Sequence, residues 1–135
     1  MKKLLSTHYS AGAFTTAMLF LRIVIGVLML KHGYDKLFDF NGTAANMMNL
    51  FGIGQKATTA LVIFAEFFCS ILIILGLFTR LACIPLIITM AVALFVAHNG
   101  DFWGKGQVAA LYLIGYVVLL LVGAGRVSVD SMIGK

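Results

Sequence analysis

The sequence predicts an all-α membrane protein, a bundle of four transmembrane helices with a short interfacial or re-entrant helix between the first two. Of its 135 residues, 61% are hydrophobic and only 11% are charged. A soluble domain carries about 25% charged residues, so this chain has too few charges to cover a water-facing surface. Its apolar runs do not alternate with polar residues, which argues against membrane-spanning β-strands.

Four apolar runs are long enough to cross a hydrocarbon core of about 30 Å, which takes about 17–25 helical residues. They cover approximately 14–32, 58–78, 81–98 and 107–124. We expect all four to belong to one membrane domain over residues 1–135.

The first run follows a mostly polar segment that starts with Lys2 and Lys3. A secretory signal would place its hydrophobic core next to these lysines, so we expect an uncleaved first span. The second and third runs are separated by little more than Thr79 and Arg80, which predicts an antiparallel hairpin.

The connection between the first two spans, residues 33–57, is the longest. Thr43 is positioned to cap a short helix over 44–51, which Gly52 and Gly54 would end. The apolar residues of this helix cover too much of its circumference for one amphipathic stripe. We therefore expect it to lie in the interface or to dip into the bundle.

An even number of spans puts both termini and the hairpin turn on one side of the membrane. That side carries Lys2, Lys3, Arg80, Arg126 and Lys135, and the other carries Lys36, Lys56 and Lys105, with Lys31 at its edge. Lys and Arg favour the cytoplasmic side, so a bias of five against three or four predicts cytoplasmic termini.

Two charged residues, Arg22 and Glu66, lie near the middle of their spans. An ionisable side chain at that depth costs about 2.5–3.5 kcal/mol, so it should face the bundle and find a partner. At about 1.5 Å per residue from opposite faces, the two Cα atoms differ little in depth. We predict an Arg22–Glu66 ion pair, or a water or ligand shared between them. The structural alternative is a pair that only fixes helix register.

Other polar residues gather near this predicted centre and suggest a pocket that opens to the non-cytoplasmic side. Gly26 and Gly33 share the face of Arg22 and would let a neighbouring helix come close. We place His32, Lys36 and His98 at the mouth of the pocket, and Ser70, Tyr112 and Tyr116 as candidate ligand contacts. The alternatives are an interfacial role for the third-span histidine and simple packing for the tyrosines.

Several function classes are disfavoured. The net charge of +5 does not indicate a nucleic-acid partner, because the ten basic residues are scattered singly and form no stripe. The three histidines have no paired spacing, so we expect no metal site. The chain contains no nucleophile elbow, P-loop or dinucleotide fingerprint, and we expect no catalytic residues and no intrinsic catalysis by this chain alone. The lipid bilayer is its expected partner.

Short motifs follow one another in a defined order. Arg22 comes before Gly26, and the end of the first span, 31–37, reads Lys-His-Gly-Tyr-Asp-Lys-Leu. Glu66 is followed ten residues later by Gly-Leu-Phe-Thr-Arg, and His98 ends the third span. The segment 123–130 reads Gly-Ala-Gly-Arg-Val-Ser-Val-Asp. In order and spacing, over nearly the whole chain, these motifs resemble the DoxX family of small bacterial four-helix membrane proteins.

The resemblance implies a multi-pass protein of the bacterial inner membrane that serves as a membrane subunit or accessory of a redox system. Relatives include the membrane subunit of a thiosulfate:quinone oxidoreductase, so a quinone is the implied cofactor and an oxidoreductase the implied partner. With a quinone bound, Arg22 or His98 would donate a hydrogen bond and Glu66 would accept a proton. The family's glycines after the glutamate are replaced by 67–69, Phe-Phe-Cys, whose bulk we expect to narrow the pocket.

Two other classes remain open. A small proton-coupled transporter also packs four spans and exchanges protons through one membrane glutamate, although an arginine at equal depth would neutralise it. A purely structural membrane protein would need neither a ligand nor a redox partner. Self-association into a homo-oligomer is compatible with all three.

Overall fold

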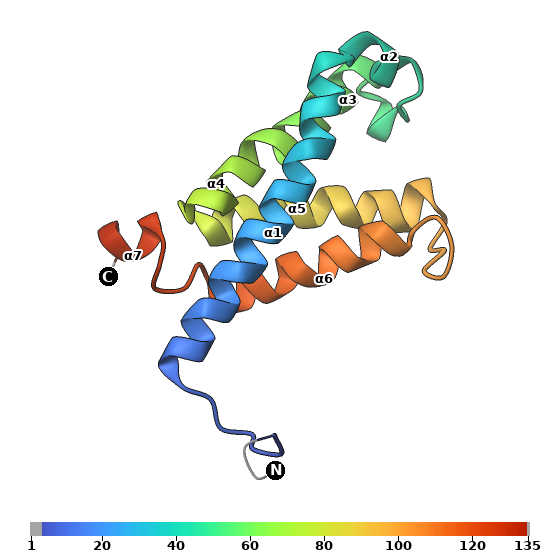
Figure 1. Cartoon of the computed structure of the whole chain (residues 1–135). Coiled ribbons are helices and arrows are strands. Elements are labelled where there is room, and N and C mark those ends of the chain that lie inside the picture. Colours follow the sequence, from blue (N-terminus) through green and yellow to red (C-terminus); the bar gives the residue numbers. More distant parts are fainter. Residues whose placement is uncertain (1–3, 135) are drawn as a thin grey trace.

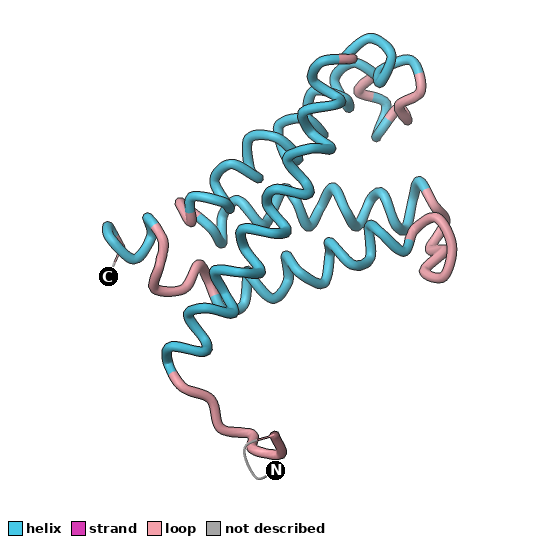
Figure 2. The backbone as a smooth tube through the Cα atoms, in the orientation of Figure 1, coloured by secondary structure: helices cyan, strands magenta, loops and turns pink. Residues whose placement is uncertain are grey.

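The computed structural model describes residues 4–134, so Lys2, Lys3 and Lys135, which entered the orientation count, lie outside the described residues. Within that part every regular element is helical, as the sequence predicts (Figures 1 and 2).

Four long helical stretches form the body of the molecule. They are α1 (Ala11–Phe38), a second stretch made of α3 (Gln55–Ile63), the π-helical turn η2 (Phe64–Cys69) and α4 (Ser70–Leu75), a third made of α5 (Thr79–Val92) and the π-helical turn η3 (Ala93–Ala97), and α6 (Gln107–Val122). The first three are long and apolar enough to cross a membrane, whereas α6 is apolar but has 16 residues. The shorter elements are α2 (Phe40–Ala45), the 3₁₀ turn η1 (Leu50–Gly52) and α7 (Val129–Ile133).

The first helix is longer than its apolar run. Its N-terminus is capped by Ser10, whose Oγ accepts a hydrogen bond from the amide of Ala13 at 2.9 Å. Its C-terminus lies at Phe38, six residues beyond the predicted end. Charged residues end the apolar run but not the helix, because Lys31 and Asp35 form an ion pair one turn apart at 2.6 Å.

The short helix of the first connection lies earlier than predicted. It covers Phe40–Ala45 rather than 44–51, so Thr43 is inside it and does not cap it. The reason is the extension of α1, after which the chain turns at Asp39 and forms the short helix at once. A 3₁₀ turn follows at Leu50–Gly52, where Phe51 has a positive φ of 51° that interrupts any regular helix.

The C-terminal segment closes the turn between the second and third stretches. Gly76 ends α4 in the left-handed conformation, with φ 70°. The Asp130 carboxylate accepts hydrogen bonds from the amides of Phe78 at 2.7 Å and Thr79 at 2.9 Å, which caps the N-terminus of α5. The Asp130 amide in turn donates to the Gly76 carbonyl at 2.8 Å.

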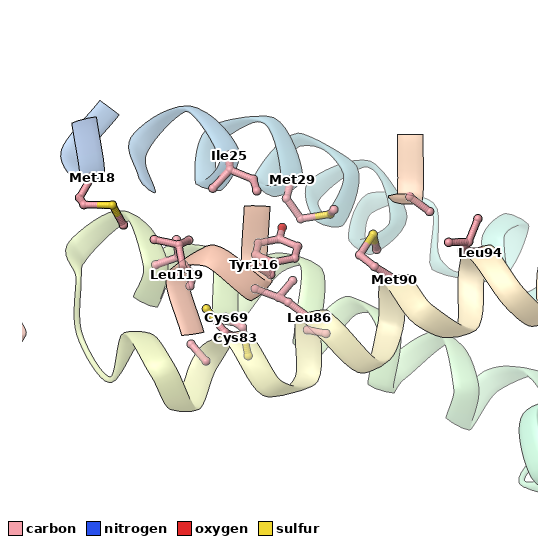
Figure 3. Packing of buried hydrophobic residues seen from close by; sticks show 14 residues of the cluster. Met18, Ile25, Met29, Cys69, Cys83, Leu86, Met90, Leu94, Tyr116 and Leu119 are labelled. Atoms are coloured by element: carbon pink, nitrogen blue, oxygen red, sulfur yellow. The ribbon is translucent and has the colours of Figure 1, made fainter. Parts of the chain in front are cut away.

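The long stretches pack as two pairs, α1 against η2 and α4, and α5 against α6. Figure 1 shows these pairs close together beside α7 and diverging toward α2 and the α5–α6 connection. We call the first region the terminal end and the second the loop end. Between the pairs lies the apolar core, in which Met29, Leu86 and Tyr116 are buried and the free thiols of Cys69 and Cys83 lie near one another (Figure 3).

Two glycines set the register between α1 and the second stretch. A Cβ atom on Gly33 would lie 2.6 Å from the Phe67 amide nitrogen and 2.7 Å from the Glu66 carbonyl carbon. A Cβ atom on Gly26 would lie 2.5 Å from a side-chain carbon of Ile74. The predicted close approach at these glycines is confirmed, and it fixes which residues of the two stretches can meet.

Candidate functional site

The buried carboxylate of Glu66 is paired with a lysine. Lys36 Nζ donates to Glu66 Oε1 at 2.5 Å, and the side chains are 27% and 5% exposed, respectively. The last turn of α1 supplies the lysine and the π-helical turn η2 supplies the carboxylate. This ion pair satisfies the charge that the sequence places in the second span.

Arg22 does not reach Glu66, so the predicted Arg22–Glu66 ion pair is wrong. Its guanidinium donates to the carbonyl of Ala124 at 2.7 Å and to that of Ile74 at 3.5 Å. The glycine contacts set Glu66 beside Gly33, eleven residues along α1 from Arg22, or about 16 Å at 1.5 Å per residue. The prediction that Arg22 and Glu66 lie at the same depth assumed that the first two helices end at the same level. The α1 helix instead extends past its predicted C-terminal boundary.

A polar pocket of about 200 Å³ surrounds the Lys36–Glu66 pair at the loop end of the molecule. Its polar lining consists of Lys36, Glu66, His32, His98, Lys105 and Tyr112. The structure thus brings together the three residues expected at the mouth, Glu66 and one of the two tyrosines. The ring of His32 meets that of Tyr112 edge-on, with centroids 5.9 Å apart.

Lys105 was not among the expected site residues. It lies in the α5–α6 connection, and from the sequence we expected it only to help set the orientation of the chain in the membrane. Its position two residues before Gln107, where α6 begins, is the signal that places it near the start of that helix.

Ser70 and Tyr116, predicted as ligand contacts, lie in the core and do not line this pocket. Both are fully buried, and neither hydroxyl has a hydrogen-bond partner among the described residues. Tyr116 stacks on Tyr112 with ring centroids 6.2 Å apart, and Figure 3 shows it between α1 and Leu86. The α6 helix therefore presents one tyrosine to the pocket and one to the core.

The two helices on either side of the pocket both contain a π-helical turn there. One turn contains Glu66, and the other, Ala93–Ala97, immediately precedes His98. Such turns occur frequently at functional sites, because an extra residue redirects a side chain without ending the helix. The expected narrowing by Phe67 and Phe68 is not observed, since neither residue lines the pocket and Phe68 is half exposed on the outer surface.

Arg22 belongs to a separate polar cluster at the terminal end. A Cβ atom on Gly76 would lie 2.5 Å from Ser128 Cβ and 3.0 Å from Arg22 Cζ, so the glycine lets the arginine and the C-terminal segment meet. The arginine binds carbonyls on both sides of this contact, and Asp130 caps α5 beside it. The cluster joins α1, the α4–α5 turn and the C-terminal segment.

Comparison with known proteins identifies the family. The DoxX family model matches residues 17–99. The chain belongs to the DoxX family. It is 33% identical to an uncharacterized protein of Haemophilus influenzae, over 86% of this chain and 90% of that one. It is 30% identical to an uncharacterized membrane protein of Mycobacterium tuberculosis, over 85% and 80% of the two chains.

A third relative, the inner membrane protein YphA of Escherichia coli, is 26% identical over 91% of this chain and 95% of its own. No solved structure matches this DoxX chain. The membrane-protein relatives and the long apolar helices support a multi-pass location in the inner membrane.

The motifs that resemble DoxX proteins divide between the two polar clusters. The motif at 31–37 supplies His32, Gly33 and Lys36 to the loop end. The motif at 123–130 belongs to the terminal end, where the carbonyl of Ala124 accepts from Arg22 and the carboxylate of Asp130 accepts from the amide of Phe78. In the part of the chain that the structure describes, the loop-end cluster lines a pocket whose acid, Glu66, is buried, so it is the candidate functional site of this DoxX protein.

Proposed function

We propose that this DoxX protein is a membrane subunit or accessory of a redox system, and that its polar pocket binds the head of a quinone. One observation carries the proposal: a buried carboxylate, Glu66, is paired with Lys36 in a pocket that two histidines and a tyrosine also line. An intramembrane ionisable residue with a defined partner is a functional-site candidate by default.

The pocket offers the groups that quinone reduction requires. A quinone accepts two electrons and two protons to become a quinol, and its two carbonyl oxygens accept hydrogen bonds. His98 and Tyr112 can donate such bonds, and Glu66 and the histidines can pass protons. The electrons come from a partner oxidoreductase. Arg22, at about 16 Å from the site along α1, has no part in this chemistry.

A lipid-facing groove between α1 and α6 provides a route for the isoprenoid tail. This groove of about 420 Å³ shares Val108 and Tyr112 with the polar pocket. Ligand pockets usually measure about 300–1,000 Å³, so the polar pocket of about 200 Å³ suits a head group with the rest of the molecule outside.

In the bilayer, we place all four long helical stretches across the hydrocarbon core as an antiparallel bundle with cytoplasmic termini. The α6 helix, with 16 residues, spans about 24 Å at 1.5 Å per residue, and a thinned bilayer accommodates the difference. The loop end then faces the non-cytoplasmic side. A C-terminal fusion to a reporter that is active only in the cytoplasm tests this orientation.

The functional test measures bound quinone and bound protein after purification in mild detergent. We expect quinone to co-purify with the wild-type chain, to fall strongly in Glu66→Gln, and to remain in Ser70→Ala, which removes a buried hydroxyl outside the pocket. Mass spectrometry should identify an oxidoreductase in the same preparation. If no quinone is retained or taken up and Glu66→Gln instead abolishes proton-coupled dye efflux, the chain is a transporter and the redox proposal is wrong.

A further inference from the structure

The charges that line the polar pocket do not cancel. Two lysines, Lys36 and Lys105, line it together with one carboxylate, that of Glu66. With His32 and His98 neutral, the lining therefore carries one positive charge in excess, and protonation of either histidine adds to it. Because Lys36 is paired with Glu66, the excess charge is that of Lys105.

Lys105 has no carboxylate partner in the part of the chain that the structure describes. The ion pairs found there join Lys31 to Asp35 and Lys36 to Glu66. Asp101, the acidic residue of the same connection, does not line the pocket, and its carboxylate lies against Gly104. An unpaired cation on the wall of a pocket attracts ligands of the opposite charge, so Lys105 is available to an anion.

Lys36 can bind the same ligand without leaving Glu66. Its ammonium has three donors, of which the ion pair uses one. The Glu66 side chain is 5% exposed, so the pair has to persist when a ligand enters, because an unpaired carboxylate in such a place is costly. A negative group that enters the pocket thus meets two lysines and a carboxylate that is already neutralised.

The remaining lining is apolar and suits a ring. Met29, Met90 and Val108 line the pocket beside the charged groups. The sulfur of methionine makes favourable contacts with aromatic rings. An apolar wall and an excess positive charge in one pocket together favour a flat ring that carries one ionised oxygen.

We propose that the quinone bound in this pocket carries an acidic ring hydroxyl and binds as its anion, and that Lys105 is the residue that selects this charge. The inference rests on the proposed function and names the class of quinone. The hydroxyl is already ionised in water, so no proton moves on binding, and the single negative charge of the ligand cancels the excess on the lining.

Equilibrium dialysis of the purified full chain in mild detergent tests the proposal, with protein-free micelles as the blank. One probe is a naphthoquinone that carries a hydroxyl on its quinone ring, which is ionised at neutral pH, and the other is its uncharged methyl ether. A buffer at about pH 8.5 keeps histidine neutral. We expect the wild-type chain to bind the anion about five-fold more tightly than the ether, the factor that one net charge contributes at a solvated site.

Variants of Lys105 test which residue selects the charge. Lys105→Gln should abolish the preference for the anion, and Lys105→Glu should reverse it. Both change an exposed side chain of a connection, so the bundle should fold. Lys56→Gln is the matched control, because it removes an exposed lysine at the start of α3 that does not line the pocket, and it should keep the preference.

Two results overturn the proposal while the quinone site stands. In one, the wild-type chain binds the ether as tightly as the anion; in the other, Lys105→Gln and Lys56→Gln lower the preference equally. If neither probe binds to the wild-type chain, the proposed function itself is wrong, and this inference is wrong with it.

Discussion

Replacing Lys36 with methionine should destabilise the protein far more than the same change five residues earlier on the same helix. Lys36→Met leaves a carboxylate unpaired whose side chain is 5% exposed. Breaking a buried pair by removing one partner costs about 3–5 kcal/mol. Because the Lys36 side chain is 27% exposed and water reaches it, we expect the lower end, about 3 kcal/mol. Methionine keeps the length of the side chain, so lost packing contributes little.

Lys31→Met is the matched control, since Lys31 forms an ion pair with Asp35 in which the side chains are 71% and 56% exposed. An exposed pair of this kind contributes about 0.3–0.5 kcal/mol. Thermal unfolding in mild detergent, followed by circular dichroism, measures both variants. The double variant Lys36→Met, Glu66→Leu removes both charges and should recover most of the loss. Equal stability of the two single variants, or no recovery in the double variant, would refute the reasoning.

Three further predictions concern the register and the terminal end. Gly33→Ala should lower the free energy of unfolding by about 1–3 kcal/mol, because the added Cβ would meet backbone atoms of η2. Gly12→Ala is the control: its Cβ would meet nothing nearer than 3.9 Å, so the change should be neutral or stabilising. Thermal unfolding in detergent compares the two variants. Asp130→Ala should cost about 1–2 kcal/mol by removing the cap of α5, and Asp130→Asn should retain part of it. Arg22→Gln should release the C-terminal segment, measured as faster trypsin cleavage at Arg126 than in the wild-type chain.

The helices could be predicted because hydropathy is a local property of the sequence. The apolar runs locate the four long stretches to within a few residues at most ends, and the positions of His32 and His98 near the ends of their runs correctly bring them to one end of the molecule. The family resemblance added the motifs but assigned no contacts among them.

The partner of Glu66 could not be predicted because it depends on register. A shift of one helix along another is decided by which residues allow close approach, and two glycines make that decision here. Lys36 was predicted at the mouth of the pocket and not as the partner of Glu66, because the apolar run ends at residue 32, although the helix continues to Phe38. Arg22 was assigned to the wrong cluster for the same reason.

The capping of α5 by Asp130 has a consequence for the order in which the chain can acquire its structure. The carboxylate that completes the start of this helix is synthesised only after all the residues of α5 and α6. During membrane insertion the amides of Phe78 and Thr79 must therefore be satisfied by water or lipid head groups. The segment that contains Asp130 then closes a turn that was translated earlier, so the start of α5 is completed only after α6 has been made.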